Sequence, residues 1–356
     1  MTPFTAFDHA MMARALELGA KGLYTTTPNP RVGCVIAQGE TVIGEGWHEK
    51  AGGPHAEVVA IGQAGARVVG ATLYVNLEPC NHQGRTAPCV DLIKKNKIKR
   101  VIAAMVDPNP KAAGGGAALA AAGIGFQHGL MEAEAKELNI GFVSRVTRGR
   151  PWVRMKIAAT LDGRTALANG KSQWITGAAA RKDGHHWRAR ACAILTGIGT
   201  VKADDPRLTV RDVETPRQPL RVVVDSRLEI AENARIFEGG NVLIFCGVEP
   251  KRKLSAEIQR LPNATGKVEL PEMLEELARR GVNELHVEAG FRLNGSLVRE
   301  RCVDEFLIYF NPSFLGDGAQ GMLELAGASS LDERMKLRIA SVDRVGDDLR
   351  ILARPA

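Results

Sequence analysis

Strand-length apolar stretches alternate with helical segments along almost the whole chain, and this alternation limits the folds that the chain can adopt. In the first part we expect helices at 5–18, 55–64, 116–122 and from residue 89 onward, and strands at 32–37, 41–46, 72–77 and 101–105. Connections of this length join parallel strands, which need helices on the faces of their sheet. The pattern predicts an α/β fold.

A polar, basic stretch with a glycine and a proline interrupts the alternation at 144–151. Beyond it we expect strands at 152–159, 193–196, 220–225, 242–246, 284–288 and 305–310, and helices near 178–190 and 293–301. The chain has 356 residues, which is more than one ordinary core holds. Because polar breaks of this kind join domains, we predict two α/β domains, residues 1–147 and 148–356.

The chain carries a net charge of +7, which is compatible with an acidic partner. The excess is shared between the two halves, and only 94–100 (KKNKIKR) is locally dense. A cluster this small at a helix end is typical of a solvated surface, so we expect no nucleic-acid partner. The charge suits phosphorylated small molecules equally well.

The sequence shows no sign of export or membrane insertion. Its first 22 residues lack the basic start and apolar run of a signal peptide. No apolar stretch approaches the roughly 18 residues that a membrane-spanning helix needs. The six cysteines are expected to be reduced thiols. We therefore predict a cytoplasmic protein that has no contact with a membrane.

One imidazole and two thiols stand in positions that suit a metal ion. His55 and Glu57 open a predicted helix, Cys80 follows a predicted strand, and Cys89 begins the next helix. Catalytic zinc takes three such ligands and keeps a fourth position for water. Glu57 lies beside the metal without having to bind it, which suits the proton transfers that deamination of an aminopyrimidine ring requires. The order H-x-E, P-C and C is that of zinc deaminases.

The spacing departs from that of the zinc deaminases, whose cysteines are two residues apart. Here eight residues, 81–88, separate Cys80 from Cys89. His82, Arg85 and Thr86 in this insertion can bind a substrate phosphate or a base edge, or the insertion is a surface loop. For His48 two orientations remain open, one with its side chain toward the metal site and one with its side chain away from it. Cys34 is expected to pack in the core.

Two other functions are compatible with part of the pattern. A nucleoside or transfer-RNA deaminase would also carry H-x-E, but the second half lacks the aromatic and basic clustering of an RNA-binding module. A non-catalytic protein with structural zinc would need four protein ligands, and we find three and a glutamate.

The second half offers weaker signals. Gly197 and Gly199 begin a glycine motif, but Lys202 stands where a dinucleotide-binding fold has its third glycine. The segments after the strands at 193–196 and 284–288 are ordinary turns, or helix starts whose backbone amides bind phosphate.

Seven motifs together resemble the bifunctional deaminase/reductases of riboflavin biosynthesis. They are TPNPRVG (27–33), HAE (55–57), EPCNHQGRTAPC (78–89), DPNP (107–110), MKIAATLDGRTA (155–166), SQWITG (172–177) and GTVKADDPRLTVR (199–211). The resemblance implies a cytidine-deaminase-like three-layer domain followed by a dihydrofolate-reductase-like α/β domain. It also implies an assembly of two or four copies.

The same resemblance implies two reactions. The first is deamination of 2,5-diamino-6-ribosylamino-4(3H)-pyrimidinone 5′-phosphate with one zinc ion per chain. The second is reduction of the ribosyl group to ribityl with NADPH, which yields 5-amino-6-(5-phosphoribitylamino)uracil.

The site residues implied by the resemblance fall into four groups. Zinc is bound by His55, Cys80 and Cys89, with Glu57 as the proton donor. Deaminase substrate contacts are Asn29, His48, His82 and Arg85. Nicotinamide-cofactor positions are Ala158, Trp174, Thr200, Asp204 and the loop Gly290, Phe291, Arg292, Leu293, Asn294, Gly295 and Ser296. Reductase substrate positions are Lys156, Ser172, Arg188, Leu208, Arg211 and Glu288.

The chain departs from the family pattern at four positions. These differences affect substrate binding and leave the zinc ligands unchanged. They are Asn81, Gln83 and Ala87, where the family usually reads CSHHGRTPPC, and Gly115, where a basic residue is common.

Overall fold

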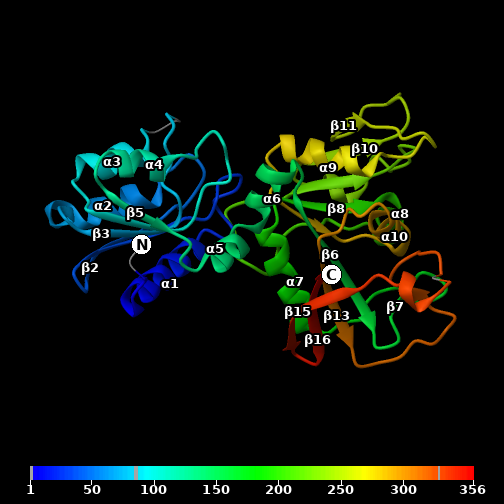
Figure 1. Cartoon of the computed structure of the whole chain (residues 1–356). Helices are drawn as coiled ribbons and strands as arrows, with labels where there is room; N and C mark the ends of the chain where they lie inside the picture. Colours follow the sequence, from blue (N-terminus) through cyan, green and yellow to red (C-terminus); the bar gives the residue numbers. More distant parts are fainter. Residues whose placement is uncertain (1–2, 84–86, 328) are drawn as a thin grey trace. The chain divides into compact units, whose positions relative to one another are not determined.

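The computed structural model describes residues 3–83, 87–327 and 329–356. The chain forms two compact units, Met1–Gly149 and Arg150–Ala356, each with its own sheet (Figure 1). In the described part of the chain, no helix is long and apolar enough to cross a membrane.

The first unit has a five-stranded sheet in the order β2-β1-β3-β4-β5. Its strands are β1 (Gly33–Gln38), β2 (Thr41–Trp47), β3 (Thr72–Leu77), β4 (Arg100–Met105) and β5 (Gly125–His128). Strand β1 is antiparallel to β2 and β3, whereas β3, β4 and β5 are parallel. Its helices are α1 (Ala6–Ala20), α2 (Ala56–Ala64), α3 (Cys89–Lys95), α4 (Gly115–Ala121), α5 (Glu132–Leu138) and α6 (Ile140–Arg148).

Alternating side chains of β1 divide the core of this unit into two. Cys34 and Ile36 pack in one cluster with residues of α2, α3 and α4. Val35 and Ala37 pack in the other with residues of α1, α5 and α6. The sheet therefore lies between two helix layers, and the predicted three-layer fold is confirmed.

The second unit has a nine-stranded sheet in the order β11-β10-β9-β8-β12-β6-β13-β16-β15. Its strands are β6 (Trp152–Thr160), β8 (Ala193–Gly197), β9 (Leu220–Val224), β10 (Val242–Cys246), β11 (Glu257–Arg260), β12 (Glu284–Val287), β13 (Glu305–Asn311), β15 (Leu337–Val345) and β16 (Asp348–Pro355). A small pair, β7 (Arg164–Ala166) and β14 (Gln320–Gly321), lies apart from it. From β11 to β13 the strands are parallel, and β16 and β15 add an antiparallel edge.

Helices cover both faces of this sheet. They are α7 (Ala178–Arg190), α8 (Ile198–Asp204), α9 (Leu270–Arg279) and α10 (Phe291–Arg299). Residues of α9 and α10 share a core cluster with Phe306 of β13, while α7 packs against Leu307, the next residue, on the opposite face. This is the α/β arrangement predicted for the second domain, and its dihydrofolate-reductase-like class is confirmed.

Two local expectations were wrong, and one open alternative is decided. The polar stretch at 144–151 is helical for most of its length, because α6 continues to Arg148. The helix ends at Gly149, whose φ is 70°. The segment 290–296 is not a loop, because α10 begins at Phe291 with Gly290 as its N-cap. Of the two alternatives left open for the segment after 193–196, the structure has the helix start, because α8 begins at Ile198. Helix α6 ends in the basic residues Arg145 and Arg148, while Phe142 is buried, so the polar end of an amphipathic helix reads as a linker in the sequence.

Candidate active sites

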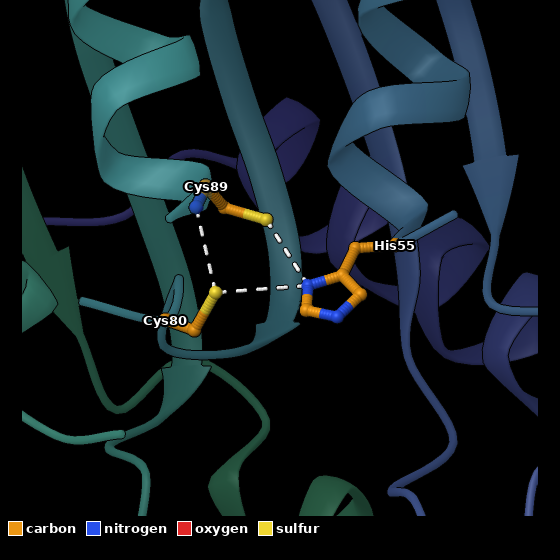
Figure 2. Close-up of side chains that lie close together, drawn as sticks. All are labelled: His55, Cys80 and Cys89. Atoms are coloured by element: carbon orange, nitrogen blue, oxygen red, sulfur yellow. Dashed lines mark hydrogen bonds between the residues drawn. The ribbon is translucent and has the colours of Figure 1, made fainter. Parts of the chain in front are cut away.

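The three predicted metal ligands converge in the first unit (Figure 2). His55 is the N-cap of α2, Cys80 follows β3, and Cys89 is the first residue of α3. The Nδ1 atom of His55 lies 3.2 Å from the Sγ of Cys89 and 3.6 Å from the Sγ of Cys80. All three candidate ligand atoms lie within 4.8 Å of one another, and no other such group occurs in the described residues.

These separations fit a zinc ion. Zinc–nitrogen and zinc–sulfur bonds of about 2.0 and 2.3 Å in a tetrahedral site place the two ligand atoms about 3.5 Å apart. The pKa of the Cys80 thiol is lowered to about 4, chiefly by a hydrogen bond from the Cys89 thiol and also by His55. The same contact raises the pKa of Cys89. One imidazole and two sulfur atoms would thus hold a zinc ion and leave a fourth position for water.

Glu57 lies next to this cluster in the first turn of α2. Its side chain is 4 % exposed and hydrogen bonds with the Cys89 thiol. Burial raises the pKa of Glu57. A buried carboxyl group beside the metal ligands, and outside their set, is placed to carry protons.

Asn29 and His48 also meet beside the cluster. The Nδ2 of Asn29 donates to the Nε2 of His48 at 3.0 Å, and the Nδ1 of His48 donates to the carbonyl of Pro54 at 2.8 Å. Both ring nitrogens are therefore engaged, and burial lowers the pKa of His48. The ring of His48 lies 5.7 Å from that of His55, edge to face. His48 therefore faces the site.

The insertion between the cysteines is described in part. His82 is exposed, and Arg85, the other predicted substrate contact there, lies outside the described residues, as does Thr86. The backbone N–H of Asn81 donates to the carbonyl of Ala112, which joins the start of the insertion to the segment that precedes α4. The role of the insertion stays a prediction.

Glu78 is a buried residue of this site to which the sequence analysis assigned no role. Its carboxylate accepts the backbone N–H of Asp107 at 2.9 Å and that of Gly116 at 2.7 Å. It thereby ties the segment that carries Cys80 to the ends of β4 and the start of α4. Its position in E-P-C, two residues before a ligand, is the signal that could have found it.

Gly115 fits closely against the same segment. A Cβ atom added to Gly115 would lie 2.0 Å from the carbonyl oxygen of Pro79. The position at which the family commonly has a basic residue therefore has no room for a side chain on this backbone.

In the second unit, Arg188 of α7 and Glu288 at the end of β12 form a two-pronged ion pair. The Nη2 of Arg188 lies 2.8 Å from Oε2 of Glu288, and its Nε donates to Oε1. Lys156 of β6 is close enough to both to feel their charges, and burial lowers its pKa. Three of the predicted reductase substrate residues thus lie together.

The segment after α8 adds two more of those residues. Leu208 is buried with a φ of 50°. The backbone N–H of Arg211 donates to Nδ1 of His185 at 3.2 Å, which holds this segment against α7. The remaining one, Ser172, hydrogen bonds to Asp204, the last residue of α8.

Two of the predicted cofactor positions, Thr200 and Gly290, meet where α8 and α10 begin. Both helices follow neighbouring parallel strands, β8 and β12, so both start at the same edge of the sheet. A Cβ on Gly290 would lie 3.6 Å from Oγ1 of Thr200, and a Cβ on Gly197 would lie 3.1 Å from Leu293. Helix starts at the carboxyl ends of parallel strands present backbone N–H groups that suit phosphates.

The other cofactor positions are placed less uniformly. Ala158 lies on β6 opposite Tyr309, and Trp174 is 71 % exposed with Arg181 stacked on its ring at 4.7 Å. Phe291 and Arg292 belong to the first turn of α10.

Asn294, Gly295 and Ser296 of α10, which are predicted cofactor positions, lie against backbone carbonyl groups of the same unit. Asn294 donates to the carbonyl of Ala289 at 3.1 Å. Ser296 donates to the carbonyl of Arg292 at 3.2 Å. A Cβ on Gly295 would lie 2.2 Å from the carbonyl of Glu324.

Two family models match the chain. The cytidine and deoxycytidylate deaminase zinc-binding region matches residues 5–105, and the RibD C-terminal domain matches residues 151–351. The chain is 41 % identical to the riboflavin biosynthesis protein RibD of Haemophilus influenzae, with 100 % of this chain and 99 % of that protein covered. It is 42 % identical to RibD of Escherichia coli, with 96 % and 98 % covered.

Solved structures agree with these relatives over the whole chain. RibD of Acinetobacter baumannii has a TM-score of 0.92 at 40 % identity, with 98 % of this chain and 99 % of that chain covered. The diaminohydroxyphosphoribosylaminopyrimidine deaminase/5-amino-6-(5-phosphoribosylamino)uracil reductase of Thermotoga maritima has a TM-score of 0.90 at 34 % identity, with the same coverage.

Proposed function

We propose residue roles for the two reactions of this chain, which belongs to the RibD family of riboflavin biosynthesis proteins. The protein is a bifunctional deaminase and reductase that uses zinc and NADPH. Residues 1–147 form the deaminase domain and residues 148–356 the reductase domain. The division of the chain between Gly149 and Arg150, and the ranges of the two family matches, support this assignment.

In the deaminase domain, His55, Cys80 and Cys89 hold the zinc ion. When bound, zinc activates a water molecule for attack on a carbon atom. Glu57 moves the protons: its carboxylate takes one proton from the attacking water and gives it to a ring nitrogen, then takes the remaining hydroxyl proton and gives it to the departing amino group. The ring carbon thereby exchanges NH₂ for oxygen, and ammonia leaves. The convergence of the three ligands beside buried Glu57 is the observation that carries this proposal.

The substrate of this site is 2,5-diamino-6-ribosylamino-4(3H)-pyrimidinone 5′-phosphate, a small phosphorylated pyrimidine. His48 orients the Asn29 amide through the hydrogen bond between them, and this amide contacts the pyrimidine edge. His82 and Arg85 bind the phosphate. We retain the prediction of an assembly of two or four copies, of a cytoplasmic location and of no nucleic-acid partner.

In the reductase domain, NADPH supplies the hydride. Its phosphates bind where α8 and α10 begin, near Thr200 and Gly290. Lys156, Arg188 and Glu288 bind the ribosyl group, and the convergence of their charges supports this assignment. The remaining predicted positions for the cofactor are Ala158, Trp174, Asp204 and 291–296, and those for the substrate are Ser172, Leu208 and Arg211.

One assay tests both halves. The purified protein is incubated with the diaminopyrimidinone phosphate, with and without NADPH, and both ammonia and NADPH absorbance are followed. We expect ammonia in both samples and NADPH oxidation only after deamination. Ammonia release without any later NADPH oxidation would contradict the assignment of the reductase, and the absence of ammonia would contradict that of the deaminase.

A further inference from the structure

His286 is a fully buried imidazole at the centre of the second unit, and the proposed reduction gives it no role. It lies on β12 with 0 % of its surface exposed. Successive side chains of a strand point to opposite faces, so His286 shares its face with Glu284 and with Glu288. The backbone N–H of Glu288 still bonds to Leu195 of β8, which extends this alternation past the end of the strand.

Glu288 is the polar group that this imidazole faces. The Nε2 of His286 lies 3.4 Å from Oε1 of Glu288. Neither ring nitrogen, Nε2 included, makes a hydrogen bond of good geometry in the described residues, so the approach to Glu288 is a long contact. A buried N–H without an acceptor costs about 1–3 kcal/mol. The proton of the neutral ring is therefore best placed on Nε2, toward the carboxylate.

The cross-strand neighbours of His286 do not compete for it. Arg154 on β6 is held by the carboxylates of Glu284 and Glu305, and as a guanidinium it offers the ring no acceptor. Ile194 on β8, the neighbour on the other side, is apolar. Burial lowers the pKa of His286, which keeps the ring neutral with a single N–H.

Glu288 is consequently held from two elements. Arg188 reaches it from α7 and pairs with both oxygens, whereas His286 reaches Oε1 from its own strand. Lys156 lies near enough for the Glu288 charge to act on it, but the two make no ion pair in the described structure. A carboxylate with less support on Oε1 can turn toward the ammonium group of Lys156, which is half-buried.

We propose that His286 is a positioning residue of the reductase site, whose Nε2–H holds Oε1 of Glu288 in the orientation that pairs with Arg188. This inference rests on the proposed role of Glu288 in binding the ribosyl group. His286 keeps Glu288 and Lys156 apart, so that both stay available to the substrate. It touches neither substrate nor cofactor.

The first test compares side chains that differ in their hydrogen-bonding atom. His286→Leu removes the donor, His286→Gln places an amide N–H near Nε2, and His286→Asn places one near Nδ1. The deaminated intermediate is supplied directly and NADPH oxidation is followed. We expect kcat/KM to fall about 10- to 100-fold in the leucine variant. The glutamine variant should stay within a few-fold of the wild type, and the KM for NADPH should not change.

Two controls separate positioning from packing. Ile194→Val shortens the cross-strand neighbour of His286 without touching a polar group, and it should leave the reductase kinetics unchanged. Ammonia release by the other domain of the same chain should be equal in all variants. Equal losses in the leucine and glutamine variants, or no loss in the leucine variant, would overturn the proposal. If His286→Leu fails to fold, the asparagine and glutamine variants decide. A higher reductase activity in His286→Asn than in His286→Gln would overturn the proposal.

A second readout does not depend on activity. In ¹⁵N-labelled protein, the imidazole signals that disappear in His286→Gln belong to His286. We expect them to show a neutral ring with its proton on Nε2, and to shift in Glu288→Gln. A proton on Nδ1 would overturn the proposal even in an active enzyme. A wild-type protein that oxidises no NADPH would instead contradict the proposed reductase function.

Discussion

The sulfur of Cys80 accepts a hydrogen bond from the backbone N–H of Cys89 at 3.4 Å. Eight residues separate the two cysteines along the chain. Their closeness comes from the start of α3, which presents Cys89 to the segment after β3. The insertion therefore changes what surrounds the metal site without separating its ligands.

Replacement of one of these sulfurs should abolish metal binding. In Cys80→Ser, a hydroxyl takes the place of a thiolate, so we expect zinc and deaminase activity to disappear together. Zinc per chain is measured by elemental analysis and activity by ammonia release. Cys34→Ser changes a buried cysteine outside the cluster and should keep its zinc. Stoichiometric zinc in Cys80→Ser would show that Cys80 is not a ligand.

The second prediction separates a ligand from a proton carrier. Glu57→Gln keeps the size and polarity of the side chain but cannot carry a proton. We expect zinc to remain and ammonia release to fall by roughly 10²- to 10⁴-fold. If this variant released ammonia at nearly the wild-type rate, another group would have to move the protons.

Glu78→Gln should weaken zinc binding, because Glu78 supports the segment that carries Cys80. An amide has one acceptor oxygen where the carboxylate has two, so one of the N–H groups of Asp107 and Gly116 loses its partner. We expect zinc affinity, measured by competition with a chelator, to fall about 10- to 100-fold, as for other residues that support metal ligands. Glu40→Gln, at an exposed position of the same unit, is the control. Unchanged zinc affinity would limit Glu78 to a structural role.

Asp204→Ala should impair reduction and spare deamination. Asp204 accepts hydrogen bonds from Ser172 and Gln173, so its loss releases the segment that leads to Trp174. A lost bond to a charged group corresponds to about 10- to 100-fold in binding or rate. Asp205→Asn is the matched control, because Asp205 accepts from the backbone of Arg235 and asparagine can do the same. Equal loss of both activities in a folded Asp204→Ala protein would mean that the two domains are coupled.

The stability of the second unit should depend on pH through His185. Burial, and then the charge of Arg188, lower the pKa of His185 from 6.5 to about 4. Between these values the unfolded chain binds a proton that the folded chain does not, so stability falls as the pH falls from about 6.5 to 4. The limiting slope is about 1.36 kcal/mol per pH unit. Urea unfolding at several pH values gives the change in unfolding free energy with pH, and this slope should be smaller in His185→Gln. An unchanged slope would show that His185 is not the group responsible.

The sequence by itself determined the bounds of several elements. The strands β3 and β10 are buried along nearly their whole length, and apolar runs of strand length marked them. The helix α7 also has the expected bounds, 178–190. It also predicted the candidate metal ligands, which the structure brings together, and Glu57 beside them, since few residue types bind zinc and their order along the chain is characteristic. Membership of the family followed from motifs spread over both halves.

Tertiary structure decided what depends on contacts between distant residues. The edge strand β15 is exposed along most of its length, and its pairing with β16 holds it in the sheet. The contacts of Asn29 with His48, and of Glu78 with Gly116, join residues from separate elements. Local propensity cannot specify such pairs, because their geometry is set by the register and packing of the whole sheet. The contact between His286 and Glu288 likewise needs the burial that β6, β8 and α7 provide together.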